Sequence, residues 1–348
     1  MKIFDLEYLI LSSVRHVRAR VRKAFIKKQV STYLFLRYLS IFIIAYNIFI
    51  SNSPSLPKPQ PAKANSGLVL SQETKADVPK IPTPRRILGS PDFEKLLGKS
   101  ALVLDATTSA VLYEKGSSTK LPPASLTKMM TSLVVLDYKN LSDEVRISLD
   151  CTKSDGAKVG FSEGQTFTVE SLLYALLLPS ASDAACSLST SLPLPGPEAS
   201  PSARFINAMG KKALEIGLKG SAFTNPVGLD DGRIYSTAAD LLTLSKKFME
   251  NTELQKIVNT VSKKITSLDG KASFNLKNTN ELLLRESGFK GIKTGTTPNA
   301  LGCLAFIYER DGHKVIGVVL GSPLTPQDGR FADAKNLVDW IFKSYEWK

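Results

Sequence analysis

The sequence predicts an α+β fold, in which an antiparallel β-sheet is flanked by helices and a helical subdomain is inserted between its first and last strands. Alternating apolar residues around short polar turns predict strands from residue 101, and this pattern returns after residue 264. The region between them has apolar residues at helical spacing. Strands at both ends of one region, with helices in the middle, are typical of this fold class.

A basic leader is predicted over residues 1–50. Residues 1–37 hold nine of the 45 Lys and Arg residues and only two Asp or Glu residues. Tyr38–Ile50 then runs for thirteen residues without a charge. Positive charge ahead of an apolar segment predicts a cleaved signal peptide or a retained signal anchor, and it places the rest of the chain outside the cytoplasm. A retained segment would attach the protein to the membrane.

Residues 51–91 are predicted to be a proline-rich linker, because eight of the nineteen prolines fall between residues 51 and 99. The folded domain is expected over residues 92–348. The formal charge of +13 does not predict a nucleic-acid partner, since much of it belongs to the leader and no nucleic-acid-binding motif accompanies it.

The first elements of the domain are two predicted strands, Ala101–Asp105 and Ala110–Tyr113. A helix follows from Ser125, because the two prolines before Ala124 can lead into a helix but cannot lie within it. Further helices are expected over Val169–Leu178, from Ser180, over Phe205–Leu218 and over Thr237–Asn251, with residues 190–203 as a loop.

The last elements are mostly strands. Asp269-Gly270 predicts a hairpin between Ile265–Leu268 and Ala272–Leu276. Three longer strands are expected over Gly288–Thr294, Leu301–Tyr308 and Val315–Leu320, and Asp328–Tyr345 is expected to close the chain as a helix.

Ser125 and Lys128 form the first candidate catalytic motif. Residues three apart on a helix share a face, so the serine hydroxyl and the lysine amine are expected to meet. The helix N-terminus adds about half a positive charge and free backbone N–H groups, which suit a nucleophile whose attack creates an oxyanion. A Ser-x-x-Lys sequence also occurs by chance in ordinary amphipathic helices, so the motif needs support from other parts of the chain.

Histidine, cysteine and metal chemistry have little support. His16 lies in the leader and His313 has no catalytic pattern around it, which leaves lysine as the better base. Cys151, Cys186 and Cys303 lack metal-ligand spacing and allow at most one disulfide. The simpler expectation for all three is a small, buried, hydrophobic side chain, with their disulfide status left open. Neither a metal nor a cofactor is expected.

Two further motifs follow the first in the chain. Ser180-Ala181-Ser182 is a serine turn between two predicted helices, and Lys293–Thr297 stands at the end of a predicted strand. A strand edge with a cation and a glycine suits an extended peptide that ends in a carboxylate. With all three motifs in this order, the sequence resembles the low-molecular-mass penicillin-binding proteins, which are the D-alanyl-D-alanine carboxypeptidases of serine peptidase family S11.

The resemblance extends over about residues 101–340. It includes the blocks Pro123–Thr131, Leu176–Ser180, Asn225–Asp230 and Gly291–Gly295. It implies a β-lactamase/transpeptidase-like fold, a periplasmic location on the extracytoplasmic face of the inner membrane, peptidoglycan stem peptides as substrates and β-lactams as covalent inhibitors.

The resemblance also implies a role for each motif. Ser125 would attack the carbonyl between two D-alanines, and Lys128 would accept the serine proton. The pKa of that lysine must then fall from 10.4 to about 7–8, which costs roughly 4 kcal/mol. Ser180 would pass the proton to the leaving amine. Backbone N–H groups of Ser125 and Thr296 would form the oxyanion hole, and Lys293, Thr294 and Thr296 would hold the terminal carboxylate.

One departure from the family pattern lies in the substrate-binding part of the second motif. The family usually has Ser-x-Asn, whereas Ser182 occupies the asparagine position here. Serine offers one short hydroxyl where asparagine offers a carbonyl and an amide, so we expect activity to persist at a reduced level. Many relatives also carry a C-terminal β-domain and a membrane-lying helix. Since Lys348 follows the last predicted helix closely, any anchoring is expected from the N-terminus.

Three alternatives remain open. A D,D-endopeptidase that cuts peptidoglycan cross-links would use the same residues with a different pocket beyond the leaving group. An inactive penicillin-binding relic, or a wall-binding module, would keep the fold without turnover. A class A β-lactamase would need a Glu-x-x-x-Asn pattern, but the nearest match, Glu215, has Lys219 at the asparagine position.

Overall fold

The computed structural model describes residues 82–198, 200–324 and 329–348. Its strands are β1 (Pro84–Arg86), β2 (Ser100–Asp105), β3 (Val111–Lys115), β4 (Glu144–Arg146), β5 (Thr166–Thr168), β6 (Ser262–Thr266), β7 (Ser273–Lys277), β8 (Phe289–Thr297), β9 (Leu301–Arg310), β10 (His313–Ser322) and β11 (Tyr345–Trp347). Its helices are a 3₁₀ helix (Ala124–Leu126), α2 (Thr127–Tyr138), α3 (Leu149–Thr152), α4 (Val169–Leu177), α5 (Ser182–Thr190), α6 (Pro201–Glu215), α7 (Ala238–Phe248), α8 (Thr252–Val258), α9 (Leu282–Arg285) and α10 (Gly329–Ser344).

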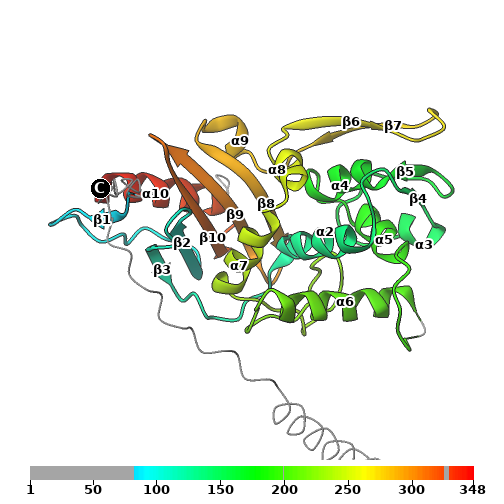
Figure 1. Ribbon diagram of the computed structural model, residues 1–348, viewed down its shortest axis with the longest axis horizontal. Coiled ribbons are helices and arrows are strands. Elements are labelled where there is room, and N and C mark those ends of the chain that lie inside the picture. Colours follow the sequence, from blue (N-terminus) through cyan, green and yellow to red (C-terminus); the bar gives the residue numbers. More distant parts are fainter. Residues whose placement is uncertain (1–81, 199, 325–328) are drawn as a thin grey trace, which may run out of the picture. The chain divides into compact units, whose positions relative to one another are not determined.

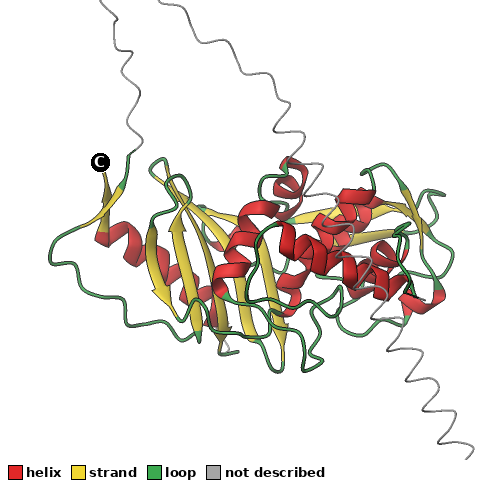
Figure 2. Ribbon diagram, turned by 60° about the horizontal axis from the view of Figure 1, so that its bottom comes forward, coloured by secondary structure: helices red, strands yellow, loops and turns green. Residues whose placement is uncertain are grey.

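A five-stranded antiparallel sheet, in the order β3-β2-β10-β9-β8, forms one half of the domain. Side chains of β9 alternate between the two faces of this sheet, because successive residues of a strand point in opposite directions. Leu304, Phe306 and Tyr308 belong to a core cluster under α10, whereas Ala305 and Ile307 belong to the cluster of the other face. The sheet is therefore covered on both faces, by α10 on one and by α7 and its neighbours on the other (Figures 1 and 2). The predicted α+β class is confirmed.

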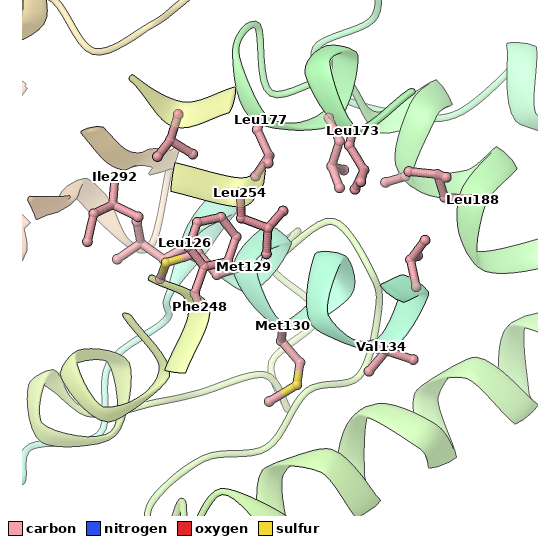
Figure 3. Close-up of a cluster of buried hydrophobic side chains, with 14 of the residues drawn as sticks. Leu126, Met129, Met130, Val134, Leu173, Leu177, Leu188, Phe248, Leu254 and Ile292 are labelled. Carbon is pink, nitrogen blue, oxygen red and sulfur yellow. The ribbon is translucent and has the colours of Figure 1, made fainter. Parts of the chain in front are cut away.

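Helix α2 lies at the centre of the helical half, and side chains from its buried part point into the hydrophobic core (Figure 3). Met129, Met130 and Val134 are at most 1% exposed. They share a core cluster with leucines of α4 and α5 and with Phe248 of α7. Lys128 starts from this buried part of α2, and its burial determines the electrostatics described below.

The hairpin predicted around Asp269-Gly270 is formed by β6 and β7. Gly270 has φ +74°, in the left-handed region that a tight turn of this kind uses. One face of the hairpin carries Ile265 and Phe274, and the Phe274 ring lies 5.2 Å from that of Phe161. The hairpin thus covers part of the helical half of the domain, and its other face is exposed.

Three elements differ from the sequence-based expectations. Helix α6 begins at Pro201, inside the predicted loop 190–203, because the Ser200 hydroxyl accepts a hydrogen bond from Ala203 N and caps the helix. Strand β8 extends to Thr297, so the third motif lies inside the strand. Strand β1, in the stretch predicted as linker, pairs with β11 at the other end of the domain. The pairing joins segments about 260 residues apart, and no local pattern signals such a contact.

Two of the three cysteines, whose disulfide status the sequence left open, are paired. Cys151 of α3 and Cys186 of α5 form a disulfide with an S–S distance of 1.99 Å. Cys303 is the small, buried side chain that the sequence predicted, and it is unpaired. A crosslink closing a loop of 35 residues stabilises a fold by about 3–4 kcal/mol through the entropy of the unfolded chain. Which cysteines pair depends on the packing of α3 against α5, which their spacing does not reveal.

None of the helices in the described ranges is both long and apolar enough to cross a membrane. The leader predicted over residues 1–50 lies outside these ranges, as does most of the predicted linker.

Candidate active site

Ser125 lies in the 3₁₀ helix that leads directly into α2, as the two preceding prolines predicted. Two glycines from distant segments press against its backbone. A Cβ on Gly228 would lie 1.9 Å from the carbonyl oxygen of Ala124, and a Cβ on Gly295 would lie 2.9 Å from Ser125 N. Only glycine allows both approaches. Strand β8 therefore runs beside the backbone N–H of Ser125, where an oxyanion hole is expected.

Lys128 extends from α2 toward the serine hydroxyl. Its Nζ lies 3.0 Å from Ser125 Oγ and 2.8 Å from the carbonyl oxygen of Val227, and the side chain is only 2% exposed. Burial disfavours the charged ammonium and lowers the pKa of Lys128 to about 7, from an ordinary value of 10.5. The amine is therefore available as a base near neutral pH, within the range that the sequence analysis required.

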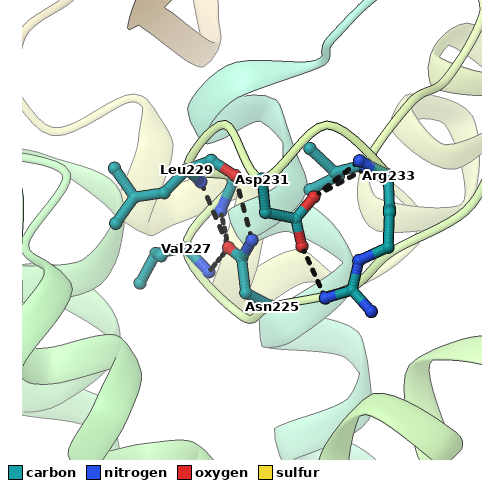
Figure 4. A network of polar contacts seen from close by, with 7 residues as sticks. Asn225, Val227, Leu229, Asp231 and Arg233 are labelled. Carbon is teal, nitrogen blue, oxygen red and sulfur yellow. Dashed lines mark hydrogen bonds and ion pairs between the residues drawn. The ribbon is translucent and has the colours of Figure 1, made fainter.

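The carbonyl of Val227 is held by a compact turn built on Asn225 (Figure 4). The Oδ1 atom of Asn225 accepts hydrogen bonds from the backbone N–H groups of Val227, Gly228 and Leu229. Its Nδ2 atom donates to the carbonyl of Leu229. The turn is rigid because one amide side chain satisfies four backbone groups, and it orients both a hydrogen-bond acceptor for Lys128 and the glycine that contacts Ala124.

Ser180 lies between α4 and α5, in the serine turn that the sequence predicted. Its φ of +64° is a rare conformation for a residue with a side chain. Its Oγ is buried and has no hydrogen-bond partner among the described residues. It lines the same pocket as Ser125 and Lys128. A strained backbone together with an unsatisfied hydroxyl facing a cavity is typical of a group that functions with a ligand.

Ser182 also lines this pocket, at the first residue of α5. Its backbone N–H donates to the carbonyl of Ala157 at 2.6 Å, and its Oγ would lie 3.0 Å from a Cβ on Gly156. The loop through Gly156 and Ala157 belongs to the pocket wall and therefore lies directly against the start of α5. The shorter side chain of serine, compared with asparagine, lies beneath this loop at the edge of the pocket.

Asp183, the residue after Ser182, joins that loop to the serine turn. Its carboxylate is fully buried, and the pocket loop surrounds it. One oxygen accepts from the backbone N–H of Gly160 at 2.9 Å and of Phe161 at 3.4 Å, and the other accepts from Val159 N at 3.3 Å and Ala184 N at 3.0 Å. Four N–H donors thus stabilise one buried charge and fix the loop relative to Ser180 and Ser182.

Replacing Asp183 with alanine is expected to lower the free energy of unfolding by roughly 3 kcal/mol, because it leaves several buried backbone N–H groups without an acceptor. Urea unfolding followed by circular dichroism measures the loss. Asp155→Ala removes an exposed carboxylate from the same loop and serves as the matched control, with an expected change of less than about 0.5 kcal/mol. Equal free energies of unfolding for the two variants would show that Asp183 does not hold the loop.

Lys293 lies behind the pocket wall, whereas Thr294 and Thr296 lie in it. The Lys293 side chain is 1% exposed, and its Nζ donates to the carbonyl of Thr294 at 3.0 Å. Burial, and then the positive charges of Lys128 and Arg330, lower the pKa of Lys293 well below its ordinary value. A negatively charged ligand beside it would raise that pKa again.

Arg330, near the start of α10, is a site residue that the sequence analysis missed. It lines the pocket, and its Nη1 donates to the carbonyl of Gly295 at 2.8 Å and to Thr296 Oγ1 at 2.6 Å. The guanidinium therefore supports the strand edge where a carboxylate is expected, and it brings a permanent positive charge to that end of the pocket. An isolated arginine 37 residues after the Lys293 motif carries no local signal that could have identified it.

The pocket thus brings together Ser125, Lys128, Ser180, Ser182, Thr294 and Thr296 from three separate segments. Among the described residues, no cluster of three or more His, Cys, Asp or Glu side chains is arranged to hold a metal ion. His313 lies outside the pocket, and its ring stacks on Trp347 at 4.6 Å. The chemistry that this arrangement supports is attack by a serine hydroxyl whose proton a neutral lysine accepts.

A sequence profile described as D-alanyl-D-alanine carboxypeptidase, of peptidase family S11, matches residues 89–323. The chain is 33% identical over 245 residues to a D-alanyl-D-alanine carboxypeptidase of Streptomyces sp. strain K15, which covers 68% of this chain and 84% of that protein. It is 32% identical over 253 residues to the carboxypeptidase DacF of Bacillus subtilis, and this match covers 71% of the chain but 63% of the relative.

Other similar proteins carry related names. A D-alanyl-D-alanine endopeptidase of Pseudomonas aeruginosa is 31% identical over 278 residues, which is 79% of this chain and 86% of that one. Among solved structures, the Streptomyces K15 DD-transpeptidase superposes with a TM-score of 0.67 at 31% identity, covering 73% of this chain and all of that one. The chain thus shares its fold with this structure along most of the domain.

Proposed function

Because this chain belongs to the D-alanyl-D-alanine carboxypeptidases of peptidase family S11, we propose that it removes the terminal D-alanine of peptidoglycan stem pentapeptides through an acyl-enzyme on Ser125. The observation that carries this proposal is the 3.0 Å contact between Ser125 Oγ and the Nζ of a buried lysine whose pKa is about 7. A hydroxyl and a neutral amine in contact form the nucleophile–base pair that acyl transfer requires.

In the first step, Ser125 Oγ forms a bond to the carbonyl carbon between the two D-alanines while its proton moves to Lys128 Nζ. The backbone N–H of Ser125 and that of Thr296 stabilise the negative charge on the carbonyl oxygen, and each such donor is typically worth 10²–10³ in rate. The carbon–nitrogen bond then breaks, and the Ser180 hydroxyl passes a proton to the departing amine. Water attacks the acyl-enzyme in the second half of the reaction and releases Ser125.

The carboxylate of the departing D-alanine is assigned to the end of the pocket formed by β8 and α10. Thr294 and Thr296 offer hydroxyls there, and Arg330 and the buried Lys293 offer positive charge. A carboxylate beside Lys293 favours its protonated form, since opposite charges raise the pKa of an amine. The bound substrate would therefore shift Lys293 toward its charged form, while burial lowers the pKa of Lys128 to about 7 and so leaves a neutral fraction of this amine near neutral pH.

Release of D-alanine from a soluble stem pentapeptide tests this function directly. Wild-type protein is expected to produce free D-alanine continuously, with the pentapeptide converted to a tetrapeptide. A cross-linked stem-peptide dimer, assayed in parallel, tests the endopeptidase alternative that the name of the P. aeruginosa relative raises. Labelling by penicillin without either product would identify an inactive relic.

We also propose that the domain works outside the cytoplasm, in the periplasm or on the outer face of the inner membrane, with the leader as a cleaved signal or a membrane anchor. The basic residues before Tyr38–Ile50 support this location. The disulfide between Cys151 and Cys186 supports it independently, because such bonds persist in oxidising compartments. N-terminal sequencing of protein recovered from cells would distinguish a cleaved leader from a retained one.

The Ser182→Asn variant tests whether the departure in the second motif limits turnover. Asparagine restores a carbonyl and an amide at the pocket edge, and one added hydrogen bond to substrate is expected to raise kcat for the pentapeptide about five- to tenfold. Steady-state D-alanine release measures the change. Turnover equal to or below that of wild type would show that the pocket under Gly156 has adapted to serine.

A further inference from the structure

The hairpin β6–β7 presents an exposed polar surface beside the proposed active site. Because side chains alternate along a strand, its outward face carries one set of six residues, all of them exposed. We call this surface the hairpin face, and it consists of Ser262, Lys264, Thr266, Ser273, Asn275 and Lys277. The opposite face carries Ile265, Phe274 and Leu276, which pack in the core, so the orientation of the hairpin is fixed.

The hairpin face combines positive charge with hydroxyl and amide groups. It contains two lysines and no carboxylate, and the whole segment 262–277 holds four lysines against one aspartate. Neither Lys264 nor Lys277 forms an ion pair with a carboxylate of the described residues. The Thr266 and Ser273 hydroxyls contact each other across the strands at 2.9 Å. Such a surface suits a ligand that carries carboxylates together with hydroxyl and amide groups.

The chain runs from the hairpin face directly into the wall of the active-site pocket. Strand β7 ends at Lys277, and Thr279, two residues later, lines the pocket. Thr279 Oγ1 contacts Thr294 Oγ1 of the third motif at 2.5 Å, and its backbone N–H donates to the carbonyl of Leu178 just before the serine turn. At a rise of about 3.3 Å per residue, the face extends from roughly 7 Å to about 20 Å along the chain from the pocket wall.

From this continuity and charge, we propose that the hairpin face binds the carboxylate-bearing peptidoglycan strand that surrounds the stem peptide in the pocket. The inference rests on the proposed function, since it is the substrate polymer that supplies carboxylates at this distance. A peptide cleaved from the polymer would fill the pocket but leave the hairpin face empty. The two lysines would therefore contribute to recognition of polymeric substrate beyond what the pocket itself supplies.

The test compares two full-length double variants with the same change in net charge. Lys264→Glu/Lys277→Glu reverses the charge of the hairpin face, and Lys211→Glu/Lys219→Glu reverses two exposed lysines on and just beyond α6. Figure 1 shows α6 on the opposite side of the helical half from β6 and β7. The basic leader is common to all the proteins, so it contributes equally to each measurement.

Co-sedimentation with purified insoluble peptidoglycan at about 50 mM salt is expected to show about tenfold weaker binding for the hairpin variant and less than twofold for the control. In about 0.5 M salt the two variants should converge, because screening shortens the range of exposed charges. D-alanine release should fall at least fivefold more on the polymer than on the soluble pentapeptide. A folding defect would lower D-alanine release equally on both substrates, so a larger loss on the polymer indicates weaker binding at the hairpin face.

Equal binding by the hairpin and control variants at low salt would overturn the inference. A deficit seen only with vesicles of equal phosphatidylglycerol and phosphatidylethanolamine, and not with peptidoglycan, would assign the face to a membrane and overturn it too. Failure of the proposed function has a different signature. Wild-type protein would then release no D-alanine from the soluble pentapeptide, whatever the hairpin variants do.

Discussion

Alanine in place of Ser125 is expected to abolish covalent labelling by a fluorescent penicillin and to reduce D-alanine release by at least about 10³-fold. In the proposed mechanism the hydroxyl oxygen of Ser125 forms the acyl bond, and among the described residues no second hydroxyl is hydrogen-bonded to Lys128 Nζ. A side chain of alanine fits the space without disturbing the 3₁₀ helix, so the loss would report chemistry. Gel fluorescence after incubation with the labelled penicillin gives the readout.

The matched control is Ser132→Ala, which removes another serine from the same run of helix. Its hydroxyl is buried and donates only to the carbonyl of Lys128 at 2.9 Å, one turn earlier in α2. We expect this variant to be labelled at the wild-type rate. Labelling of Ser125→Ala at the wild-type level would show that another residue is the nucleophile and would contradict the proposed mechanism.

The second large effect concerns the proton acceptor. Arginine in place of Lys128 carries a positive charge that it cannot lose at any accessible pH, so the acylation rate should fall by about 10³-fold or more. In the wild-type protein only the neutral amine accepts the serine proton. With a pKa of about 7, the reactive fraction falls about tenfold for each pH unit below 7 and is nearly constant above 8.

The acylation rate constant of the wild-type protein, measured with penicillin between pH 5 and 9, should therefore rise with pH and level off with an inflection near 7. The residual activity of Lys128→Arg should lack this inflection. An inflection near 10 in the wild-type protein would mean that burial does not neutralise the amine. A rate that decreases with rising pH would assign the base to a different group.

Much of the fold was predictable, because the local signals agreed with the final packing. The alternating segments became β2, β9 and β10, and the prolines before Ala124 marked the start of the helix that carries Ser125 and Lys128. Local sequence patterns did not predict the features that depend on contacts between residues far apart in the chain. The disulfide depends on α3 meeting α5, and β1 exists as a strand only because β11 pairs with it.

The candidate site likewise has a part that the sequence predicted and a part that it did not. Its three motifs were visible as short patterns, and the structure brings their residues around one pocket. The supporting groups were not visible, since each acts across a long separation. The Val227 carbonyl contacts a lysine 99 residues earlier, Asp183 binds backbone 22 to 24 residues away, and Arg330 reaches back 34 and 35 residues to β8.

The amino-acid sequence by itself determined which groups could react and placed Ser125 and Lys128 one helical turn apart, because spacing on a helix is a local property. Only the tertiary structure decided that the pKa of this lysine falls to about 7, as the proposed role of a base requires. Its pKa depends on exclusion of water, and that exclusion comes from α2 being enclosed by α4, α5 and α7 and from the turn at Val227. Burial belongs to the packed chain as a whole, so no short stretch of sequence can specify it.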